Sequence, residues 1–243
     1  MDTEKFLNKI KSNDFYRDQI VHCHRITARE ASTARLKKEP PSRLAGVLAG
    51  SGINELYSHQ VEAVENLRGG NSVVVVTSTA SGKTLCYNIP VLESFLQNDK
   101  ARALYIYPTK ALAQDQLRVL DRYSREGINI KAGTYDGDTP GSQRRQLREE
   151  ANIILTNPDM LHSGILPNHA KWAGFFSRLD FVVIDEIHTY RGIFGSHVSN
   201  VIRRLERITR HYGAAPVYAA SSATIANPGE HAEKLIGKKI RVV

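Results

Sequence analysis

Short apolar runs alternate with amphipathic stretches along most of the chain. The runs are rich in β-branched residues, and two of them, Val73–Val76 and Val182–Ile184, contain no polar position. Strands without polar alternation are typical of a parallel sheet, which crossover helices bury on both faces. We therefore predict strands at Ser72–Thr77, Ala103–Tyr107, Asn129–Thr134, Ala151–Thr156, Phe181–Asp185 and Val217–Ser221.

Helical patterns occupy the stretches between these strands. The clearest run over Lys83–Leu96, Lys110–Tyr123 and His197–Arg210. Strand–helix alternation predicts a three-layer α/β fold, with a largely parallel sheet and helices on both faces. In such sheets ligands bind at the carboxyl ends of the strands. The residues directly after each predicted strand are therefore the first candidates for a functional site.

The first forty or so residues follow a different pattern. Apolar residues are scattered among charges from Met1 to Ile20, which is consistent with short helices. Pro40 and Pro41 then end any helix, because proline lacks a backbone N–H and restricts the residue before it. We expect residues 1–41 to form an N-terminal extension and linker, and residues 42–243 to form the main domain.

The composition limits the class of protein. Cys23 and Cys86 are the two cysteines of the 243 residues, which excludes a disulfide framework and a four-cysteine zinc site within the chain and fits a reducing cytosol. The cluster His22-Cys23-His24 is not expected to bind a metal, because neighbours in a strand point in alternate directions. No apolar run approaches the roughly 18–20 residues of a membrane span, and Met1–Lys5 lacks a secretory signal. We expect a cytoplasmic protein without a membrane partner.

The net charge favours a polyanionic partner. The formal charge is +8 and the sequence pI is about 9.5. Such an excess attracts nucleic acid through salt-sensitive, non-specific contacts. Many soluble proteins are basic for other reasons, so charge alone leaves the two interpretations open.

A Gly-Lys-Thr turn follows the first buried strand. Loop N–H groups and a helix N-terminus at such a turn form a phosphate cradle. Lys83 would reach the β- and γ-phosphates of ATP, and the Thr84 hydroxyl would bind Mg²⁺. Thr77 stands where the usual motif has glycine, so a chance Gly-Lys-Thr is the alternative. The position between strand and helix favours a nucleotide site made of Thr79, Ala80, Ser81, Gly82, Lys83 and Thr84.

A pair of carboxylates follows another buried strand. Asp185 comes directly after Phe181–Ile184, where a bare carboxylate would be costly without a cation. Phosphoanhydride hydrolysis needs a carboxylate for Mg²⁺ and a group that orients or deprotonates water. We assign the metal to Asp185 and the water to Glu186. Together with the phosphate loop, this predicts nucleotide hydrolysis.

The phosphate loop and Asp185-Glu186-Ile187-His188 resemble motifs I and II of superfamily 2 DExH-box helicases. The other motifs of that family's first, RecA-like lobe follow in order between Leu56 and Thr224. The resemblance implies that Tyr57 and Gln60 read the adenine base. It also implies that His188 and Ser222-Ala223-Thr224 couple hydrolysis to strand movement. The matching segments are Tyr57-Ser58-His59-Gln60, Pro108-Thr109-Lys110-Ala111-Leu112, Tyr135-Asp136-Gly137-Asp138-Thr139, Thr156-Asn157-Pro158-Asp159 and Ser222-Ala223-Thr224.

The segment from Asp185 to Val198 is similar to a narrower group, the bacterial mitomycin-repair helicases (MrfA) and their RecQ-like fungal relatives. That resemblance implies an ATP-dependent DNA helicase that moves 3′ to 5′ and acts in DNA repair. Its partner would be single-stranded DNA or a duplex with a single-stranded tail. Family members also carry a second RecA-like lobe and a C-terminal metal-binding domain with four cysteines, so we expect this chain to be a fragment that hydrolyses ATP very poorly alone.

The same resemblance implies contacts between this lobe and the nucleic-acid backbone. Hydroxyls, amides and helix N-termini are suitable donors to phosphate, although the same residues also make turns and helix caps. The arginines Arg203, Arg204, Arg207 and Arg210 are expected to form a solvated helix face instead. An RNA helicase, or a nucleotide-binding module without turnover, remains as an alternative. The candidate contacts are Thr109, Lys110, Gly137, Thr156, Asn157, Pro158 and Arg191.

Overall fold

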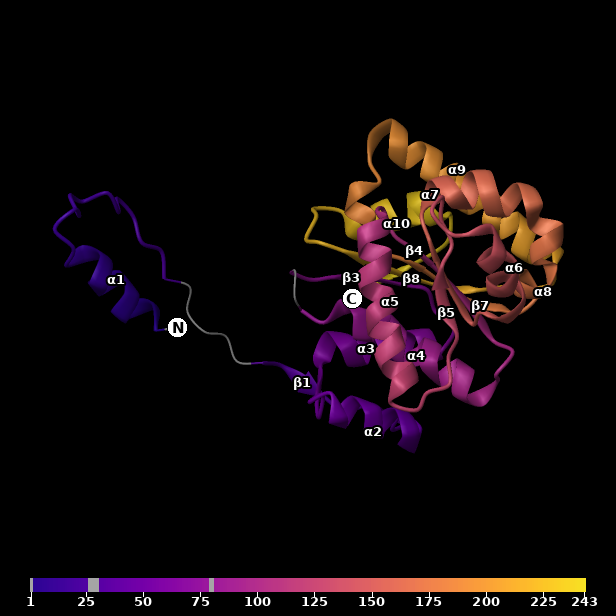
Figure 1. The fold of residues 1–243 in the computed structure, drawn as a ribbon, viewed down its shortest axis with the longest axis horizontal. Coiled ribbons are helices and arrows are strands. Elements are labelled where there is room, and N and C mark those ends of the chain that lie inside the picture. The colour runs from indigo at the N-terminus through magenta and orange to yellow at the C-terminus, as the bar shows by residue number, and fades with distance from the viewer. Residues whose placement is uncertain (1, 26–30, 79–80) are drawn as a thin grey trace. The chain divides into compact units, whose positions relative to one another are not determined.

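The computed structural model describes residues 2–25, 31–78 and 81–243 (Figure 1). The chain divides into two compact units, Met1–Ala31 and Ser32–Val243. The first unit contains helix α1 (Thr3–Lys11), as the sequence predicted for this region. Asp2 caps α1, because its carboxylate accepts hydrogen bonds from the N–H groups of Glu4 and Lys5 at 3.1 and 3.2 Å. Across the described ranges no helix combines the length and apolarity that a bilayer crossing needs.

The boundary between the units lies ten residues before the expected one at residues 41 and 42. Strand β1 (Thr33–Ala34) pairs antiparallel with β2 (Leu56–Tyr57), and the Lys37 N–H donates to Glu65 at 3.0 Å. These contacts attach residues 32–41 to the second unit, which we call the lobe. Two-residue strands carry almost no periodicity, which is why the sequence gives no sign of these contacts.

Seven parallel strands form the centre of the lobe (Figure 1). The order across the sheet is β5-β6-β4-β7-β8-β3-β9, and every pairing in it is parallel. The six strands predicted from sequence are all present, with ends that differ by no more than three residues. The strands are β3 (Val73–Val76), β4 (Arg102–Ile106), β5 (Ala132–Thr134), β6 (Ile153–Thr156), β7 (Leu179–Ile184), β8 (Val217–Ser222) and β9 (Arg241–Val242).

Helices cover both faces of the sheet, as predicted (Figure 1). One apolar core lies under α2 (Ser42–Gly50), α3 (Ser58–Arg68), α4 (Lys83–Gln97) and α5 (Lys110–Arg125). The other lies under the helices after β6. These are α7 (Pro158–Met160), the π-helical turn η1 (Leu161–Ile165), the 3₁₀ turn η2 (Leu166–Trp172), α8 (Ala173–Phe176), α9 (Gly192–His211) and α10 (Pro228–Ile236). Helix α6 (Gly141–Glu150) packs on this second core through Leu147.

An ion-pair cluster around Arg68 ties three parts of the lobe together. The Arg68 guanidinium donates to both carboxylate oxygens of Glu93 on α4, at 2.9 and 2.6 Å. It also donates to Glu65 at 3.1 Å and to the Lys38 carbonyl at 2.7 Å. The side chains of Arg68 and Glu93 are only 18% and 8% exposed. The cluster therefore fixes α3, α4 and the segment after β1 in one arrangement.

Removing the Arg68 guanidinium leaves Glu93 buried without a partner. We expect Arg68→Ala to lower the free energy of unfolding by about 3–5 kcal/mol, the usual cost of breaking a buried ion pair from one side. The matched control is Arg118→Ala, whose pair with Asp115 on α5 has side chains 78% and 64% exposed. That change is expected to cost less than about 1 kcal/mol. Urea unfolding followed by circular dichroism measures both, and equal losses would contradict a stabilising role for the Arg68 cluster.

Candidate functional site

Three neighbouring strands deliver the candidate residues to one edge of the sheet. β8 lies between β7 and β3 with parallel pairing on both sides. The phosphate loop follows β3, the pair Asp185-Glu186 follows β7, and Ser221 and Ser222 end β8. Because parallel strands end at the same edge, three segments far apart in the sequence meet there.

The phosphate loop is held together by its own side chains. The Lys83 ammonium donates to the carbonyls of Thr77 and Ser78, at 2.9 and 2.8 Å. The hydroxyls of Thr77 and Ser81 share a hydrogen bond of 2.5 Å. The threonine at the first position of the motif, Thr77, is therefore linked directly to Ser81 within the loop. The candidates Thr79 and Ala80 lie outside the described residues.

Helix α3 supports the loop from the side. The Gln60 amide donates to the Gly82 carbonyl at 3.0 Å and accepts from the Tyr57 N–H at 2.9 Å. The His59 ring contacts the Ser81 carbonyl at 3.2 Å, a contact that sequence reasoning missed. Gly82 has φ +75°, and a Cβ there would lie 2.5 Å from the Gln60 amide nitrogen. The positive φ favours glycine at this position, and any Cβ would also displace the Gln60 amide.

Tyr57 and Gln60, the expected adenine contacts, lie in different environments. Gln60 is 2% exposed, and the oxygen and the nitrogen of its side-chain amide each form a hydrogen bond with a backbone group. The Tyr57 ring is 43% exposed and stacks on the His59 ring, with 5.7 Å between the centroids. An exposed ring beside the phosphate loop is a suitable surface for stacking a base.

Asp185 is the most perturbed carboxyl of the edge. Burial, reinforced by the nearby Glu186 carboxylate, raises the pKa of Asp185 from 3.8 to about 6. Its oxygens accept from the Glu186 N–H at 2.9 Å, from the Ser221 hydroxyl and from the Tyr87 hydroxyl at 3.4 Å. Tyr87 on α4 was not predicted, because its helical position also fits the core.

Glu186 and His188 lie on the turn that follows β7. Glu186, directly after the Asp185 that follows β7, has φ +54°, a strained conformation for a residue other than glycine. The Nδ1 atom of His188 lies 3.0 Å from a Glu186 carboxylate oxygen and 3.3 Å from the Ala223 backbone nitrogen. Nδ1 must carry a proton to donate to Glu186 and must lack one to accept from Ala223. The two contacts are therefore alternatives.

Two adjacent serines at the end of β8 have different partners. Ser221 donates to Asp185, whereas the Ser222 hydroxyl donates to the Ala223 carbonyl. Of the predicted coupling residues, Ser222 is fully buried and does not bond Asp185, and Thr224 is exposed. The sequence could not separate the two serines, because alternate strand positions point to opposite faces and only the assembled sheet shows which face meets α4.

The other half of the edge collects several of the candidate nucleic-acid contacts. β5, β6 and β4 are neighbours, and the expected contact segments follow them. Thr109 caps α5 through its hydroxyl, which accepts from the Leu112 N–H at 3.3 Å. Lys110 is exposed and pairs with Asp138 at 2.6 Å, beside Gly137. This ion pair raises the pKa of the Lys110 ammonium, which stays charged.

The end of β6 and the residues after it hold three of the candidate contacts. Thr156 is 2% exposed, and its hydroxyl donates to the Tyr135 carbonyl at 2.7 Å. The Thr156 hydroxyl is therefore bonded to the segment that follows β5 and is not directed to solvent, and the predicted nucleic-acid contact at this position stays a prediction. Asn157 caps α7 by accepting from the Met160 N–H at 2.8 Å, and Pro158 opens that helix as a buried residue.

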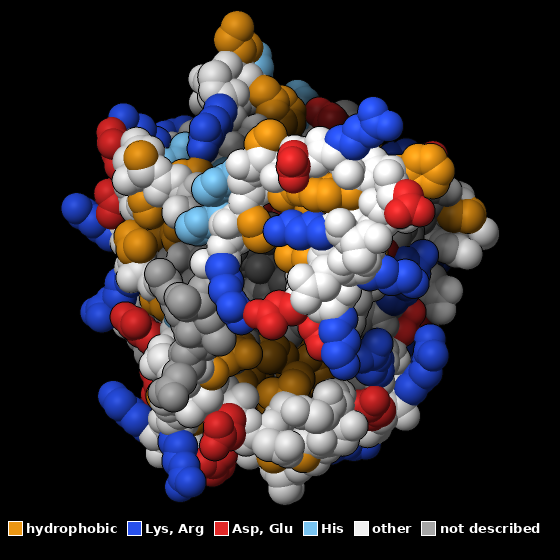
Figure 2. Space-filling view, turned by 90° about the vertical axis from the view of Figure 1, so that its left-hand side faces the viewer, with side chains coloured by type: hydrophobic (Ala, Val, Ile, Leu, Met, Phe, Trp, Pro, Cys, Tyr) orange, Lys and Arg blue, Asp and Glu red, His pale blue; other side chains and the backbone are white. Residues whose placement is uncertain are grey.

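Arg191 is exposed at the start of α9, where it forms the N-cap position. In Figure 2, Lys and Arg side chains are interspersed with Asp and Glu side chains on the face drawn. On that face, charge alone does not mark out a path for a polyanion. The arrangement of the strand ends is more specific, because it separates a phosphate-loop half from a half with exposed donors.

Comparisons with known proteins agree with this geometry. Residues 57–231 match the family described as DEAD/DEAH box helicase. The chain is 52% identical over 241 residues to the uncharacterized ATP-dependent helicase YprA of Bacillus subtilis (strain 168), covering 99% of this chain and 32% of that protein. It is 43% identical to the ATP-dependent helicase hrq1 of Schizosaccharomyces pombe, covering 96% of this chain and 23% of that protein. The chain thus spans a third or less of the length of these curated relatives.

Solved structures confirm the predicted RecA-like α/β fold. The DUF1998 helicase MrfA, in its crystal structure with DNA and AMPPNP, matches with a TM-score of 0.92 and 51% identity. The match covers 99% of this chain and 33% of that one. The DEAD-box helicase Mss116 bound to ssRNA matches with a TM-score of 0.72 at 16% identity, which concerns the fold alone. The predicted resemblance to the MrfA group is confirmed, whereas the RecQ-like part of it is supported only loosely.

The raised pKa of Asp185 predicts a pH-dependent cost to stability. Because its pKa is higher in the folded than in the unfolded chain, the stability that the protonated form gives is lost as the pH rises through about 6. We expect Asp185→Asn to raise the free energy of unfolding at pH 8 by about 2–3 kcal/mol in metal-free buffer. The gain should shrink to about half at pH 5. Urea unfolding at both pH values measures it, and a gain independent of pH would refute this origin.

Proposed function

The chain belongs to the DEAD/DEAH box helicase family, and on that premise we propose that it is the ATP-binding lobe of a DNA helicase or translocase. The observation that carries the proposal is the meeting of the phosphate loop, Asp185-Glu186 and Ser221 at one edge of β3, β8 and β7. The MrfA structure named above contains DNA and a nucleotide analogue. By its resemblance to that group, we also propose 3′ to 5′ movement and a role in DNA repair.

We propose that Gly82, Lys83 and Thr84 hold the ATP phosphates. The ammonium of Lys83 would leave the carbonyls of Thr77 and Ser78 for the β- and γ-phosphates, and α4 would direct its N-terminus at them. Tyr57 offers its exposed ring to the adenine base. Gln60 transmits the position of this region to the loop through its bond to Gly82.

The residues at the end of β7 fit a magnesium ion. Asp185 is an almost buried carboxylate whose anionic form is disfavoured, and a bound cation would relieve that cost. Thr84 would supply the second protein oxygen. Mg²⁺ bound there would neutralise phosphate charge as it builds up. Glu186 would orient the attacking water, and Ser221 and Tyr87 would keep the Asp185 carboxylate in place.

We propose that His188 couples the nucleotide to the end of β8. Its Nδ1 atom either donates a proton to the Glu186 carboxylate or accepts the Ala223 N–H. A change at Glu186 during hydrolysis would therefore make or break the link to the segment Ser222–Thr224. On the other half of the edge, Thr109, Lys110, Gly137, Asn157 and Arg191 would contact the DNA backbone.

The first test is nucleotide binding. We expect Lys83→Ala to weaken binding of a fluorescent Mg²⁺–ATP analogue by at least 10-fold, because a charge-assisted phosphate contact contributes about 1.5–3 kcal/mol. Lys171→Ala, an exposed lysine on η2, is the charge-matched control and should bind as the wild type does. Unchanged binding by Lys83→Ala would exclude the phosphate-loop assignment.

The second test is turnover by the 243-residue chain. Many motors of this kind receive a phosphate-contacting arginine from outside the first lobe, and such a residue increases the rate about 10³–10⁵-fold. We therefore expect negligible ATP hydrolysis with intact nucleotide binding, with or without single-stranded DNA. Robust turnover that DNA stimulates would show that this chain completes its own site. Stronger stimulation by RNA than by DNA would favour the RNA-helicase alternative.

A further inference from the structure

A groove of about 490 Å³ lies between α9 and the turns that follow β6. Its volume is within the range of roughly 300–1,000 Å³ that is usual for ligand pockets. The lining combines buried apolar residues with a rim of basic side chains and a single acid. The apolar residues are Pro158, Val198 and Val201, and the charged or titratable ones are Asp159, His162, His197, Arg204 and Arg207.

The two arginines of the groove differ from their neighbours on α9. Arg203 donates to the Lys234 carbonyl at 3.1 Å, and Arg210 pairs with Glu206 at 3.4 Å. The side chains of Arg204 and Arg207 make no hydrogen bond or ion pair within residues 2–25, 31–78 and 81–243. The four arginines were predicted to form one solvated face. The structure divides them into two that have intramolecular partners and two that line the groove without one.

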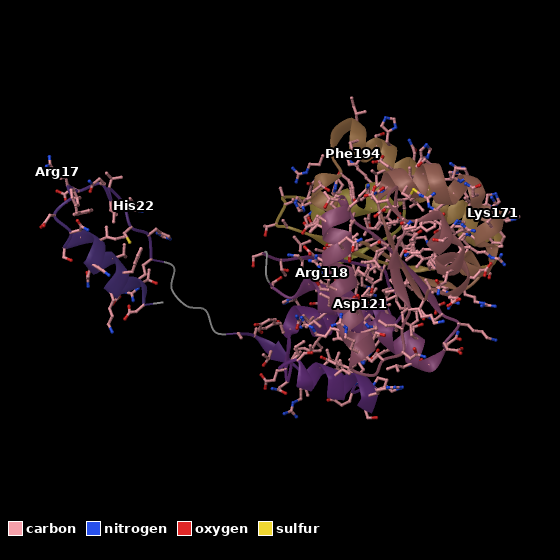
Figure 3. The ribbon with its side chains drawn as sticks, viewed as in Figure 1. Arg17, His22, Arg118, Asp121, Lys171 and Phe194 are labelled. Carbon is pink, nitrogen blue, oxygen red and sulfur yellow. The ribbon has the colours of Figure 1, made fainter. Side chains whose placement is uncertain are left out.

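An exposed aromatic ring lines the same groove. Phe194 lines the groove and is 46% exposed, and Figure 3 shows it at the start of α9. Ile193 beside it is 81% exposed. Aromatic rings next to a cationic track are the usual surface on which proteins stack the bases of single strands, whatever the sequence.

The groove is continuous with the candidate nucleic-acid half of the sheet edge. Pro158, which directly follows Asn157 at the end of β6, is part of its lining. Arg191 lies three residues before Phe194. The π-helical turn η1, a form that often occurs at functional sites, carries His162 on the opposite wall. Two candidate nucleic-acid contacts, Asn157 and Arg191, are therefore close in sequence to residues that line the groove.

We propose that this groove binds single-stranded nucleic acid, with one unstacked base against Phe194 and neighbouring phosphates on Arg204 and Arg207. Phosphate oxygens would accept hydrogen bonds from both guanidinium groups, whereas an apolar peptide in the same groove would leave them unpaired. The groove extends the proposed helicase function, because it adds a binding site beyond the motif residues. It rests on that function only for the assumption that a nucleic-acid strand crosses this lobe.

The test is binding of fluorescein-labelled oligothymidylate to the 243-residue chain, measured by anisotropy over a range of salt concentrations. We expect the double variant Arg204→Ala/Arg207→Ala to bind at least 10-fold more weakly at low salt. Its salt slope should fall by about 1.4, since each phosphate contact on a single strand contributes about 0.7. The control double variant Arg118→Ala/Arg210→Ala has the same net charge and removes exposed arginines outside the groove. It should keep both the affinity and the slope.

Substitutions at Phe194 separate stacking from general apolar contact. Phe194→Leu should weaken binding about 5-fold or more, because base stacking needs an aromatic face. Phe194→Trp should retain wild-type affinity. With an abasic oligonucleotide, wild type and Phe194→Leu should bind equally. Irradiation of an oligonucleotide that contains 5-iodouracil should cross-link to the peptide that carries Phe194.

Binding of the fluorescent ATP analogue is measured on every variant as a second readout. The groove variants should bind it as the wild type does, which shows that they are folded. If they do so and the arginine double variant binds DNA like its control, the groove proposal is overturned and the nucleotide site stands. The proposal is also overturned if Phe194→Leu binds the oligonucleotide like the wild type and the wild type gives no cross-link at Phe194. A wild-type chain that binds no oligonucleotide at low salt overturns it as well. Loss of ATP-analogue binding by Lys83→Ala is a separate result that concerns only the proposed function.

Discussion

The parallel pairing of β8 with both β7 and β3 is the constraint on which the rest of this lobe depends. Asp185 and Lys83 are about a hundred residues apart in the chain. They share an edge because the hydrogen-bonded registers of three strands place their carboxyl ends together. The same rule, applied to β5, β6 and β4, gathers a second set of polar ends beside the first. A single sheet thus gathers two adjacent sets of polar residues at the carboxyl ends of its strands.

The carboxylate at the centre of this edge opposes folding while it serves the site. Burial and the neighbouring Glu186 disfavour the charged form of Asp185, and Ser221, Tyr87 and the Glu186 N–H offset only part of that cost. Glu186 adds backbone strain, because it holds a left-handed conformation. Costs of this kind are common where chemistry takes place, since a group that is fully satisfied by its own protein has little affinity left for a ligand.

The strands, their order along the chain and the main motif residues followed from the sequence, because buried parallel strands and phosphate loops carry strong local signals. Other features depended on tertiary structure. The choice between Ser221 and Ser222 depended on strand parity relative to α4, and the burial of Thr156 depended on the pairing of β6 with β5. The short strands β1 and β9 are too brief to leave a pattern. Likewise, a helical arginine repeat cannot show that Arg203 has a partner and Arg204 does not.

The Arg68 cluster has a mechanical consequence. Arg68 grips the Lys38 carbonyl and, through Glu93, the helix that begins at Lys83. A tensile load on the backbone near residue 38 would therefore pass through the Arg68 guanidinium to Glu93 on α4. Such a strut would make the stiffness of α4 depend on how firmly the segment before it is anchored.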